Sequence, residues 1–458
     1  MITYSGDSLR DLTREDLIEL ILRQAEDIRR LQEEVTALKK PATTSRNSSQ
    51  PPSRDWKRNR PVGKRSKKRG AKLGHAKTER PLVEKPDAVI EARVTTCAQC
   101  GTDLGRVAPQ RTLRRQITEL PEIKPVVIET RQDEVECPCC HQVQRGVLPE
   151  GLEAPRQFGP RLEGLVTYFH HEHHMGFERV QTVLQDVLEI AISEGGAVAI
   201  IERAGEAAEP EAEAIGARVK QSRVIGSDET SARVHGRNWW EWVFTNLVEE
   251  YHVIVPSRGQ DVIDAFMGDH RAEVWKSDCW KPQLKAPADL HQLCIPHQIR
   301  NLQGLIDQRP RLRWAQEIQN LFRTAVHVWH RRDELTAHRF RARVMRLERR
   351  LDRLLQRRLT GRLALNLLDR FRTHRKHLLV FLHRADVSPD NNACERALRP
   401  SVIHRKVMGS FRSEWGPRAY AALATVLNTA KRAGENVFQK LVSLMGKPVL
   451  HYLTPSIA

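Results

Sequence analysis

Apolar residues recur through residues 13–40 with alternating spacings of four and three positions. One heptad position holds Leu17, Gln24, Leu31 and Leu38, and another holds Ile21, Ile28 and Val35. Thr13 is suited to cap this helix, and Asp16 follows three positions later. Apolar residues at this spacing form the seam of a coiled coil. The pattern over residues 1–40 predicts a helix that pairs with another copy of the chain, with Gln24 fixing the register. The alternative is a helix that packs on its own protein.

Helical spacing returns between residues 158 and 206. Apolar residues repeat at helical intervals over 177–188, a break follows near Ile192 and Ser193, and a second apolar run covers 197–201. Two short helices across a turn are typical of a DNA-binding helix-turn-helix, although any helical hairpin gives this pattern. Gly195 and Gly196 are expected to weaken the second helix. Residues 151–215 are therefore predicted to be helical, with a helix-turn-helix as one interpretation.

A histidine cluster stands inside this helical region, at residues 170–174 with Glu172 in the middle. Its spacing differs from that of the HExxH zinc proteases, in which the glutamate follows the first histidine and the second histidine lies four positions on. We expect these histidines to pack or to contact DNA rather than to bind a metal.

Alternating apolar positions over residues 222–280 predict a series of strands. Three strands are expected over 223–234, 239–246 and 251–256, then a short helix over 261–267 and a fourth strand over 273–277. Residues 297–385 are helical in pattern and strongly basic, and they are too long for a loop. They predict an inserted helical subdomain over about 305–385. Further helices are expected over 389–400 and at about 417–445.

The charge balance narrows the partner. The 458 residues carry 75 Lys and Arg against 57 Asp and Glu, a formal net charge of +18. This favours a polyanionic partner, either nucleic acid or an acidic membrane surface. We find neither an apolar run long enough to cross a bilayer nor an apolar signal core at the N-terminus. Eight cysteines are too few for a disulfide scaffold in a chain of this length. The composition therefore predicts a protein of two or more domains in a reducing cytoplasm.

A polar and basic linker is expected over residues 41–80. Residues 47–53 have nothing to bury, and a basic run with Trp56 inside it follows. The basic positions are Arg54, Lys57, Arg58, Arg60, Lys64, Arg65, Lys67, Lys68, Arg69 and Lys72. One interpretation is a solvated linker. We favour a DNA-binding arm that contacts phosphates and loses affinity as salt rises.

Two cysteine pairs lie within residues 81–150. Cys97 and Cys100 form one CxxC turn, and Cys137 and Cys140 form the other, with Cys139 as a spare thiol. Four thiolates in two such turns suit one tetrahedral zinc ion, because each turn presents two sulfurs. The 36 residues between the pairs predict a zinc ribbon with a long insert. The alternative is a set of reduced structural cysteines.

Three acidic residues stand in distinctive settings. Asp228 ends the apolar stretch 224–228, Asp278 ends the stretch 272–278, and Glu395 follows a helix-start pattern over 388–394. Carboxylates at two strand ends and on one helix can converge to hold Mg²⁺ or Mn²⁺. Two such ions can activate a water or a 3′-hydroxyl and stabilise the departing oxygen. In a basic protein, this arrangement predicts a site that cuts and joins nucleic acid.

The helix of Glu395 has its own signals. Ser388 and Pro389 suit its N-cap and first-turn positions, which puts Glu395 near the second turn. Arg399 lies one turn further on the same face, able to orient Glu395 or to contact a phosphate. Arg396 points elsewhere and is the weaker candidate.

Taken together, these features resemble a TnpC-type transposase of the bacterial insertion sequence 66 family over nearly the whole chain. The resemblance rests on the coiled coil, the linker at 47–53, the paired CxxC turns and the segments 168–174, 226–234, 239–244, 390–400 and 409–414. It implies an α/β fold: an RNase H-like catalytic domain over 216–458 with a helical insertion before its final glutamate. On that match, Asp228, Asp278 and Glu395 form the acidic triad, with magnesium as cofactor.

The resemblance also implies partners and activity. Such an enzyme binds the terminal inverted repeats of its element and target DNA, works as a homo-oligomer, and comes from elements that often encode small companion proteins. Cys294 and His297 resemble a CxxH signature that follows the second aspartate in several transposase families, so His297 either supports the active site or is a packed helix histidine. Cys279 and Trp280, after Asp278, depart from the family pattern.

Two alternative functions are compatible with these features. One is a DNA-binding regulator with an inactive nuclease-like domain, and the other is an RNase H-like nuclease that performs no strand transfer. The complete set of three acidic residues favours the transposase.

Overall fold

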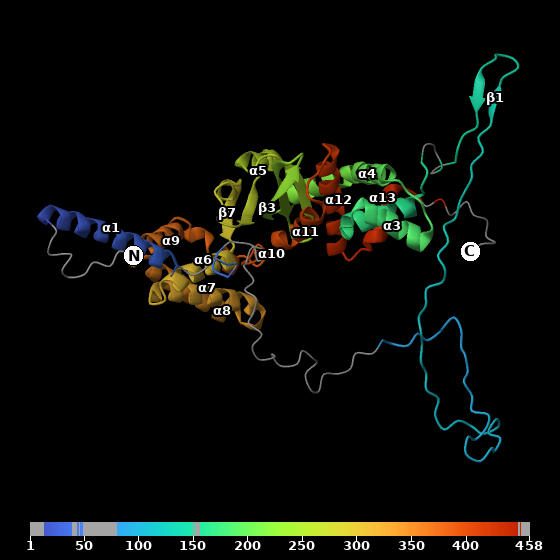
Figure 1. The fold of residues 1–458 in the computed structure, drawn as a ribbon, viewed down its shortest axis with the longest axis horizontal. Coiled ribbons are helices and arrows are strands. Elements are labelled where there is room, and N and C mark those ends of the chain that lie inside the picture. The colour runs from blue at the N-terminus through green and yellow to red at the C-terminus, as the bar shows by residue number, and fades with distance from the viewer. Residues whose placement is uncertain are drawn as a thin grey trace. The chain divides into compact units, whose positions relative to one another are not determined.

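The computed structural model describes residues 13–38, 44, 46–48, 80–149, 152, 156–447 and 449 (Figure 1). The chain divides into two compact units. One comprises residues 1–56, 129–183 and 191–458, and the other comprises residues 57–128 and 184–190. Most of the predicted DNA-binding arm, including every lysine and arginine proposed to contact DNA between Lys57 and Arg69, lies outside the described residues.

A five-stranded mixed sheet lies at the centre of the larger unit. Its strands are β3 (Val224–Val234), β4 (Arg237–Thr245), β5 (Glu250–Val255), β6 (Ala272–Ser277) and β7 (Ala288–Leu293), in the order β5-β4-β3-β6-β7. Strands β3, β4 and β5 form an antiparallel meander, and β3, β6 and β7 run parallel. The short helix α5 (Gln260–Met267) connects β5 to β6. Four of these strands and α5 lie where the apolar alternation predicted them.

Strand β7 was not predicted, because two of its buried positions are polar. His291 and Gln292 are buried at 7% and 1% exposure. The Gln292 side chain accepts a hydrogen bond from the Phe381 backbone N–H at 3.0 Å and donates to the Leu293 carbonyl at 2.7 Å. These partners satisfy a buried amide that apolar periodicity alone would place on the surface.

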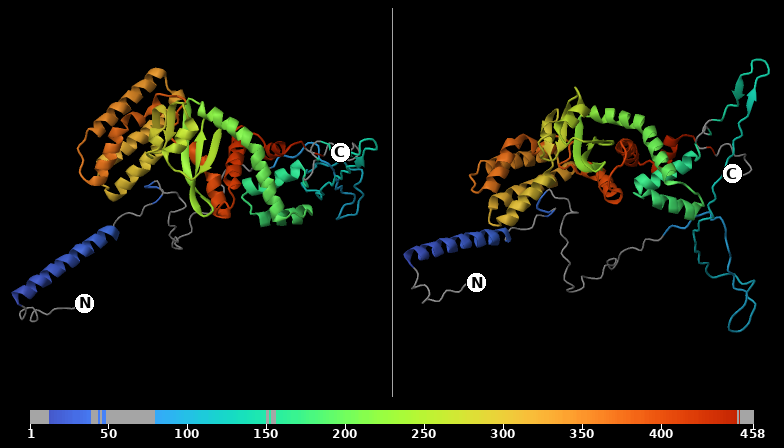
Figure 2. Two further views of the ribbon diagram at one scale, coloured as in Figure 1. Left: turned by 90° about the horizontal axis from the view of Figure 1, so that it is seen from above. Right: turned by 45° about the horizontal axis from the view of Figure 1, so that its top comes forward.

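Helices cover both faces of the sheet. On one face, Ile225, Trp242, Phe244 and Trp275 pack in a core with α4 (Glu194–Lys220), α12 (Trp415–Arg432) and α13 (Val437–Met445). On the other face, Val224, Val274 and Leu293 pack in a second core with the helices that follow β7. The two views of Figure 2 show these two helical groups on opposite sides of the sheet.

The helices after β7 occupy the region expected to be an inserted helical subdomain. They are α6 (Ile295–Gln308), α7 (Arg313–His330), α8 (Ala337–Leu355) and α9 (Arg362–Thr373), with short 3-10 turns at Arg332–Glu334, Arg375–His377 and Val380–Leu382. A further 3-10 turn, Gln283–Lys285, lies between β6 and β7. Helix α8 buries Val344, Leu347 and Leu351 and leaves most of its arginines exposed or partly exposed. The basic composition of this region therefore belongs to solvated helix faces.

The helices before the sheet differ in length from expectation. They are α2 (Pro160–Thr167), a π-helical turn at Tyr168–Glu172, α3 (Phe177–Leu188) and α4. Helix α4 has 27 residues, far more than the short second helix of the predicted helix-turn-helix. Gly195 and Gly196 were expected to weaken this helix, but they lie in its first turn and do not interrupt it. The Ser193 hydroxyl caps the helix by accepting a hydrogen bond from the Gly196 N–H at 3.0 Å.

The C-terminal helices are also divided differently. The helix expected over 389–400 is two helices, α10 (Asn392–Ala397) and α11 (Arg399–Met408), with Leu398 as their joint. Pro400 has no N–H to continue the hydrogen-bond ladder of α10, which accounts for the break. The helix expected near 417–445 is likewise α12 and α13. Gly434, at φ 78°, ends the first of them in a left-handed conformation.

Helix α1 (Arg14–Leu38) matches the N-terminal prediction of a helix. Its apolar side chains are exposed: Ile18, Ile21, Leu22, Ile28 and Leu31. Their pairing with a second copy stays a prediction. Further along, the Asn47 side-chain amide donates to the Asp307 carboxylate of α6 at 2.9 Å, which anchors this part of the linker on α6.

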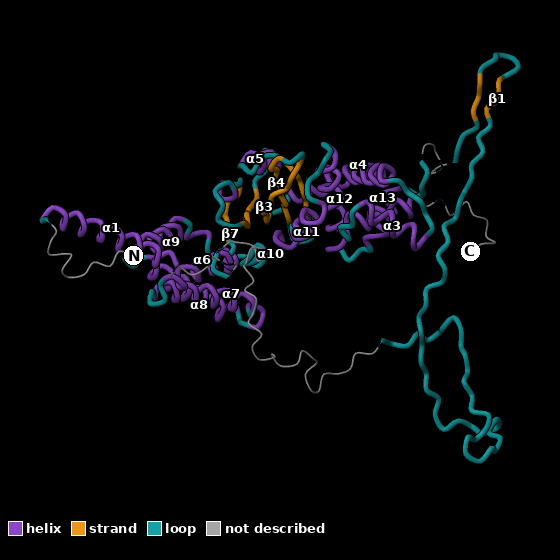
Figure 3. The backbone as a smooth tube through the Cα atoms, in the orientation of Figure 1, coloured by secondary structure: helices purple, strands orange, loops and turns teal. Residues whose placement is uncertain are grey.

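The segment around the cysteine pairs contains little regular structure. Strands β1 (Glu134–Glu136) and β2 (Val143–Arg145) form a hairpin, and Thr96 and Asp103 form a single bridge. Figure 3 shows the rest of residues 80–133 as loop. Among the described helices of the whole chain, none has the length and apolarity required to span a membrane.

Candidate active site

Strands β3 and β6 place two aspartates at the same level of the sheet. The strands are parallel, with Gly226 opposite Lys276. Asp228 lies two residues after Gly226, within β3, and Asp278 lies two residues after Lys276, directly after β6. Each carboxylate is fixed by a backbone N–H: Glu229 donates to Asp228 at 2.9 Å, and Trp280 donates to Asp278 at 2.8 Å. Both side chains are partly buried.

Helix α10 brings Glu395 to this edge of the sheet. The Asn391 side-chain amide donates to the Ser227 carbonyl at 2.8 Å, so the start of the helix is anchored next to Asp228. Cys394 is fully buried, with its Sγ 3.3 Å from the Thr245 hydroxyl on β4. A Cβ at Gly226 would lie 3.0 Å from the Cys394 Sγ, so the absence of a side chain there leaves room for the helix. Glu395 follows Cys394 and is partly exposed.

The start of this helix is a correction to the sequence expectation. Helix α10 begins at Asn392, whose N–H donates to the Asp390 carboxylate at 3.1 Å. Ser388 and Pro389 therefore precede the helix instead of capping it. The Pro389 carbonyl accepts from the Ile295 N–H of α6 at 2.9 Å. Glu395 consequently lies in the first turn rather than the second, and Arg399 begins the next helix.

Burial and repulsion from neighbouring acids act on Asp228 and Asp278. Burial, followed by repulsion from Glu229 and Asp278 and a smaller contribution from Glu395, raises the pKa of Asp228 well above its ordinary value. Burial, followed by repulsion from Glu229 and more weakly from Glu395, raises the pKa of Asp278 to about 6. Clustered carboxylates of this kind are destabilised as anions unless a cation accompanies them. The donor set consists of hard oxygen atoms and fits Mg²⁺ or Mn²⁺.

Helix α6 contributes two residues beside Glu395. His297 Nδ1 lies 3.9 Å from the Glu395 carboxylate, and the Arg300 guanidinium lies 3.7 Å from the same oxygen. The potential ligand atoms of Cys294, His297 and Glu395 all lie within 4.8 Å of one another. Burial raises the pKa of the Cys294 thiol to about 12 and lowers the pKa of His297 to about 4. At neutral pH both groups are uncharged, so Arg300 supplies the positive charge next to Glu395.

A second group of residues holds the loop after Asp278. Arg258 forms an ion pair with the buried Glu229 at 2.8 Å, and its guanidinium lies between the rings of Trp240 and Trp280, 4.4 and 4.3 Å from their centres. The Gln283 side-chain amide donates to the other Glu229 oxygen at 3.0 Å. The departure from the family pattern at Trp280 thus has a structural role, because its ring packs on Arg258 while its N–H binds Asp278.

Sequence reasoning missed Glu229, Arg258 and Arg300. The first follows Asp228 directly, and only its low exposure of 3% shows that it is part of the site. Arg300 lies three positions after His297, a spacing that puts both side chains on one helix face, so that signal was available. Arg258 is connected to Glu229 only by the fold.

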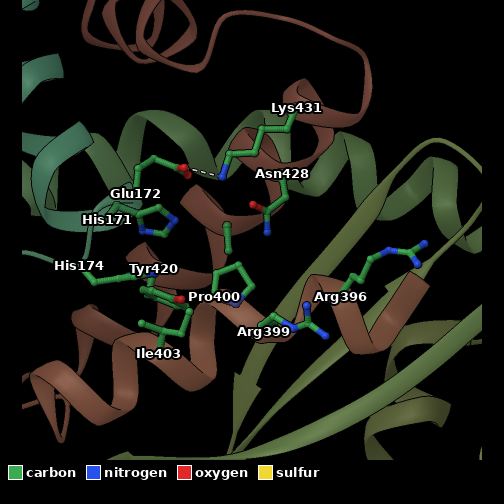
Figure 4. A pocket seen from close by; sticks show the side chains of 11 residues that line it. His171, Glu172, His174, Arg396, Arg399, Pro400, Ile403, Tyr420, Asn428 and Lys431 are labelled. Atoms are coloured by element: carbon green, nitrogen blue, oxygen red, sulfur yellow. Dashed lines mark ion pairs between the residues drawn. The ribbon is translucent and has the colours of Figure 1, made fainter. Parts of the chain in front are cut away.

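Arg396 and Arg399 line one pocket of about 320 Å³ (Figure 4). Figure 4 shows both guanidiniums extending to the same side, whereas Arg396 was expected to point elsewhere. The remaining lining residues come from the π-helical turn and from α11 and α12. Arg399 therefore belongs to α11 and not to the helix that carries Glu395.

The two cysteine turns share one backbone conformation. In the first turn, the Cys97 N–H donates to the Thr102 carbonyl at 2.9 Å, and the Gly101 N–H donates to the Cys97 carbonyl at 3.0 Å. In the second turn, the Cys137 N–H donates to the Gln142 carbonyl at 3.0 Å, and the His141 N–H donates to the Cys137 carbonyl at 2.9 Å. Gly101 and His141 both have positive φ angles, 71° and 57°. Cys140 therefore occupies the same position in its turn as Cys100 does in the first turn, and Cys139 is the extra thiol.

The thiols in these turns have lowered pKa values. The Thr102 hydroxyl, 3.1 Å from the Cys100 sulfur, lowers the pKa of that thiol to about 7. The backbone N–H of Cys140 lowers the pKa of Cys137. Both effects favour the thiolate form, in which cysteine binds metals.

A family model described as "Transposase IS66 family" matches residues 156–419. This range covers more than half of the chain and includes Asp228, Asp278 and Glu395. No curated protein sequence matches the chain at a significant level. The chain therefore belongs to the IS66 family of transposases, named for insertion sequence 66.

Proposed function

We propose that this protein cleaves the DNA ends of an insertion sequence and joins them to target DNA, with Asp228, Asp278 and Glu395 as the metal-binding residues. The observation that supports this most directly is the arrangement of the three residues. Asp228 and Asp278 each stand two positions beyond the paired residues Gly226 and Lys276 of parallel strands, and Asn391 anchors the start of the Glu395 helix on Ser227, next to Asp228. The strand order β5-β4-β3-β6-β7, a meander followed by two parallel strands, supports an RNase H-like core.

The residues of the site can be assigned separate tasks. Bound Mg²⁺ or Mn²⁺ supplies activation of a water or a 3′-hydroxyl and stabilisation of the departing oxygen. Arg258, through Trp280, keeps the Asp278 loop in place, and Glu229 keeps Arg258 in place. Arg300 and His297 orient Glu395. No covalent protein nucleophile is required by this arrangement.

The proposed partners follow from the family and the charge. A transposase acts on DNA, and the basic residues Lys57–Arg69 are suited to contact phosphates on element ends or on target DNA in the bacterial cytoplasm. We propose a homo-oligomer, because two element ends have to be brought together, and small companion proteins of the same element as further partners. The helix-turn-helix interpretation of α3 and α4 is part of the same proposal for DNA contact.

Cleavage of a DNA duplex that carries the terminal inverted repeat flanking this gene tests the proposal. With Mg²⁺, the wild-type protein is expected to nick the repeat end and to give a joined product with target DNA. Asp228→Asn is expected to reduce nicking by about 100-fold or more, because one oxygen ligand loses its charge. Asp269→Asn, which changes an exposed aspartate after α5, serves as the matched control.

Each outcome of this experiment has a distinct meaning. Equal nicking by the wild-type protein and Asp228→Asn would refute the site assignment. Specific binding of the repeat without nicking in Mg²⁺ or Mn²⁺ would point to the DNA-binding regulator instead. Nicking without a joined product would point to a nuclease.

We further propose that Cys97, Cys100, Cys137 and Cys140 bind one zinc ion. The CxxC spacing and the shared backbone turn support this, because each turn supplies two of the four thiolates that a tetrahedral zinc ion requires. Metal analysis of the purified protein is expected to give about one zinc ion per chain. Cys140→Ser should lower that content and Cys139→Ser should not. A wild-type content below about half an ion per chain would contradict the proposal.

A further inference from the structure

The pocket that Arg396 and Arg399 line is built from three separate segments. The π-helical turn and the residues after it contribute His171, Glu172 and His174, and α12 contributes Tyr420, Ala424, Asn428 and Lys431. Arg396 comes from α10, and Arg399, Pro400 and Ile403 come from α11. Arg396 follows Glu395 directly, so the pocket opens next to the helix that carries the proposed metal ligand (Figure 4).

Two positive charges in this pocket have no protein partner. The side chains of Arg396 and Arg399 are exposed and form neither a hydrogen bond nor an ion pair within the part of the chain that the structure describes. Lys431, in contrast, is neutralised by an ion pair with Glu172. Burial lowers the pKa values of His171 and His174, so both are neutral at pH 7. The pocket therefore has a net positive charge from two guanidiniums that are free to bind an anion.

The rest of the lining is suited to a flat, partly polar ring. Pro400, Ile403 and Ala424 supply apolar surface, and Asn428 supplies an amide that also hydrogen-bonds the Glu250 carboxylate. Ile403 is 45% exposed, which leaves apolar surface open to a ligand. The volume of about 320 Å³ is at the small end of the range for ligand pockets, so it suits a single nucleotide better than a duplex.

We propose that this pocket binds one nucleotide of a DNA strand next to the phosphodiester that is cleaved. The phosphate contacts Arg396 and Arg399, and the base leaves the helical stack to lie against Pro400 and Ile403 within reach of Asn428. Guanidiniums form paired hydrogen bonds to phosphate oxygens, which fits two arginines that line one pocket from the end of α10 and the start of α11. Unstacking one base costs a few kcal/mol, and contacts with the pocket offset that cost. The inference rests on the proposed function, because it assigns the pocket to the same DNA substrate.

Fluorescence of 2-aminopurine tests the inference without cleavage. The full-length protein is mixed, in Ca²⁺, with repeat-end duplexes that carry 2-aminopurine at successive positions around the nicking site. An unstacked base is expected to raise emission several-fold at one position. The double variant Arg396→Ala with Arg399→Ala should abolish this rise and weaken binding about tenfold. The control is Arg341→Ala with Arg350→Ala, which removes two exposed charges from α8 and should retain the rise.

Two further measurements distinguish a nucleotide from a phosphate alone. Ile403→Glu places a negative charge beside the base position and should abolish the emission rise, whereas Ile403→Gln should weaken it less. An abasic site removes the base contacts together with the unstacking cost, so Ile403→Gln should weaken binding of the intact duplex and leave binding of a duplex with an abasic site at the responding position unchanged. An equal effect of Ile403→Gln on the two duplexes would show that the pocket holds only a phosphate and would overturn the inference.

The inference and the proposed function can fail separately. If the wild-type protein and both arginine variants give no emission rise at any position, while the wild-type protein still nicks the repeat end, the pocket assignment alone is overturned. A rise that depends on Arg396 and Arg399 in a protein that never nicks DNA would support the pocket and overturn the catalytic proposal.

Discussion

Glu229 shows how one residue of the site depends on a neighbour that is distant in the sequence. Its charge is the largest electrostatic contribution from another acid to the raised pKa values of Asp228 and Asp278. Arg258 offsets this effect at Asp278 and is itself held between two tryptophan rings. Four acids, rather than the triad alone, therefore set the negative potential at the site, and Arg258 and Arg300 partly balance it.

The raised pKa of Asp228 predicts a conflict between stability and function. An acid whose pKa is higher in the folded protein than in the unfolded chain stabilises the fold below the unfolded value, near 3.8. That contribution is lost as the pH rises through the folded value. Asparagine is neutral at every pH, so Asp228→Asn should raise the melting temperature of the metal-free protein by about 2–5 °C at pH 7–8. At pH 4 the two proteins should melt together.

Added magnesium reverses this order. If Mg²⁺ binds the folded site as proposed, it should raise the melting temperature of the wild-type protein, whereas Asp228→Asn should respond much less. Thermal melts with and without Mg²⁺ measure both effects, and Asp269→Asn should behave as the wild-type protein throughout. If Asp228→Asn melted below the wild-type protein without metal, the electrostatic account of the site would be wrong.

The residues of the site differ in how far the sequence reveals them. Asp278 follows an apolar run and directly follows β6, so its position at a strand end could be inferred from alternation. The same expectation was wrong for Asp228, because β3 continues past it to Val234. The start of the Glu395 helix could not be inferred, because Ser388 and Pro389 imitate a helix start while Asn391 and Asp390 provide the contacts. Arg258 could not be found at all, since nothing local connects it with Glu229.

Helix α4 and helix α12 illustrate the same limit for elements. The sequence predicts both as helical, but their close approach depends on Gly205. A Cβ at that position would lie 2.2 Å from the Ala419 Cβ, far inside contact distance. Apolar periodicity also failed to predict strand β7, whose buried Gln292 side chain is satisfied by tertiary contacts. It failed likewise at Leu398, where Pro400 breaks the helix. Long, strongly periodic elements were predictable, and elements with buried polar residues were not.

Substitution of Gly205 is expected to separate α4 from α12. Gly205→Ala should destabilise the protein by about 1–3 kcal/mol, because overpacking forces the two helices apart. Gly195→Ala in the first turn of the same helix is the matched control, since nothing lies within 4 Å of its added Cβ. That change should be neutral or stabilise by up to about 1 kcal/mol. Urea unfolding of the three proteins measures the difference, and equal midpoints would refute the packing argument.

At the scale of the whole molecule, the chain separates tasks along its length. The sheet and its helices carry the acidic residues, and the cysteine turns belong partly to one unit and partly to the other. Helix α1 exposes an apolar face, with Ile21 and Ile28 at 63% and 55% exposure. Exposed apolar residues at heptad spacing are costly in water unless a partner covers them.

We therefore expect α1 to hold two or more chains together. Sedimentation of the full-length protein at micromolar concentration should give a multiple of the chain mass of 52.6 kDa. Ile21→Asp combined with Ile28→Asp puts charges into the seam and should give a monomer. Leu22→Asp makes the same kind of change at a position outside the seam, where the side chain is 64% exposed, and should leave the oligomer intact. A wild-type monomer, or an oligomer that survives the double substitution, would show that α1 is not the contact between subunits. An oligomer lost equally in the Leu22→Asp control would mean that the helix itself, rather than its seam, had been disrupted.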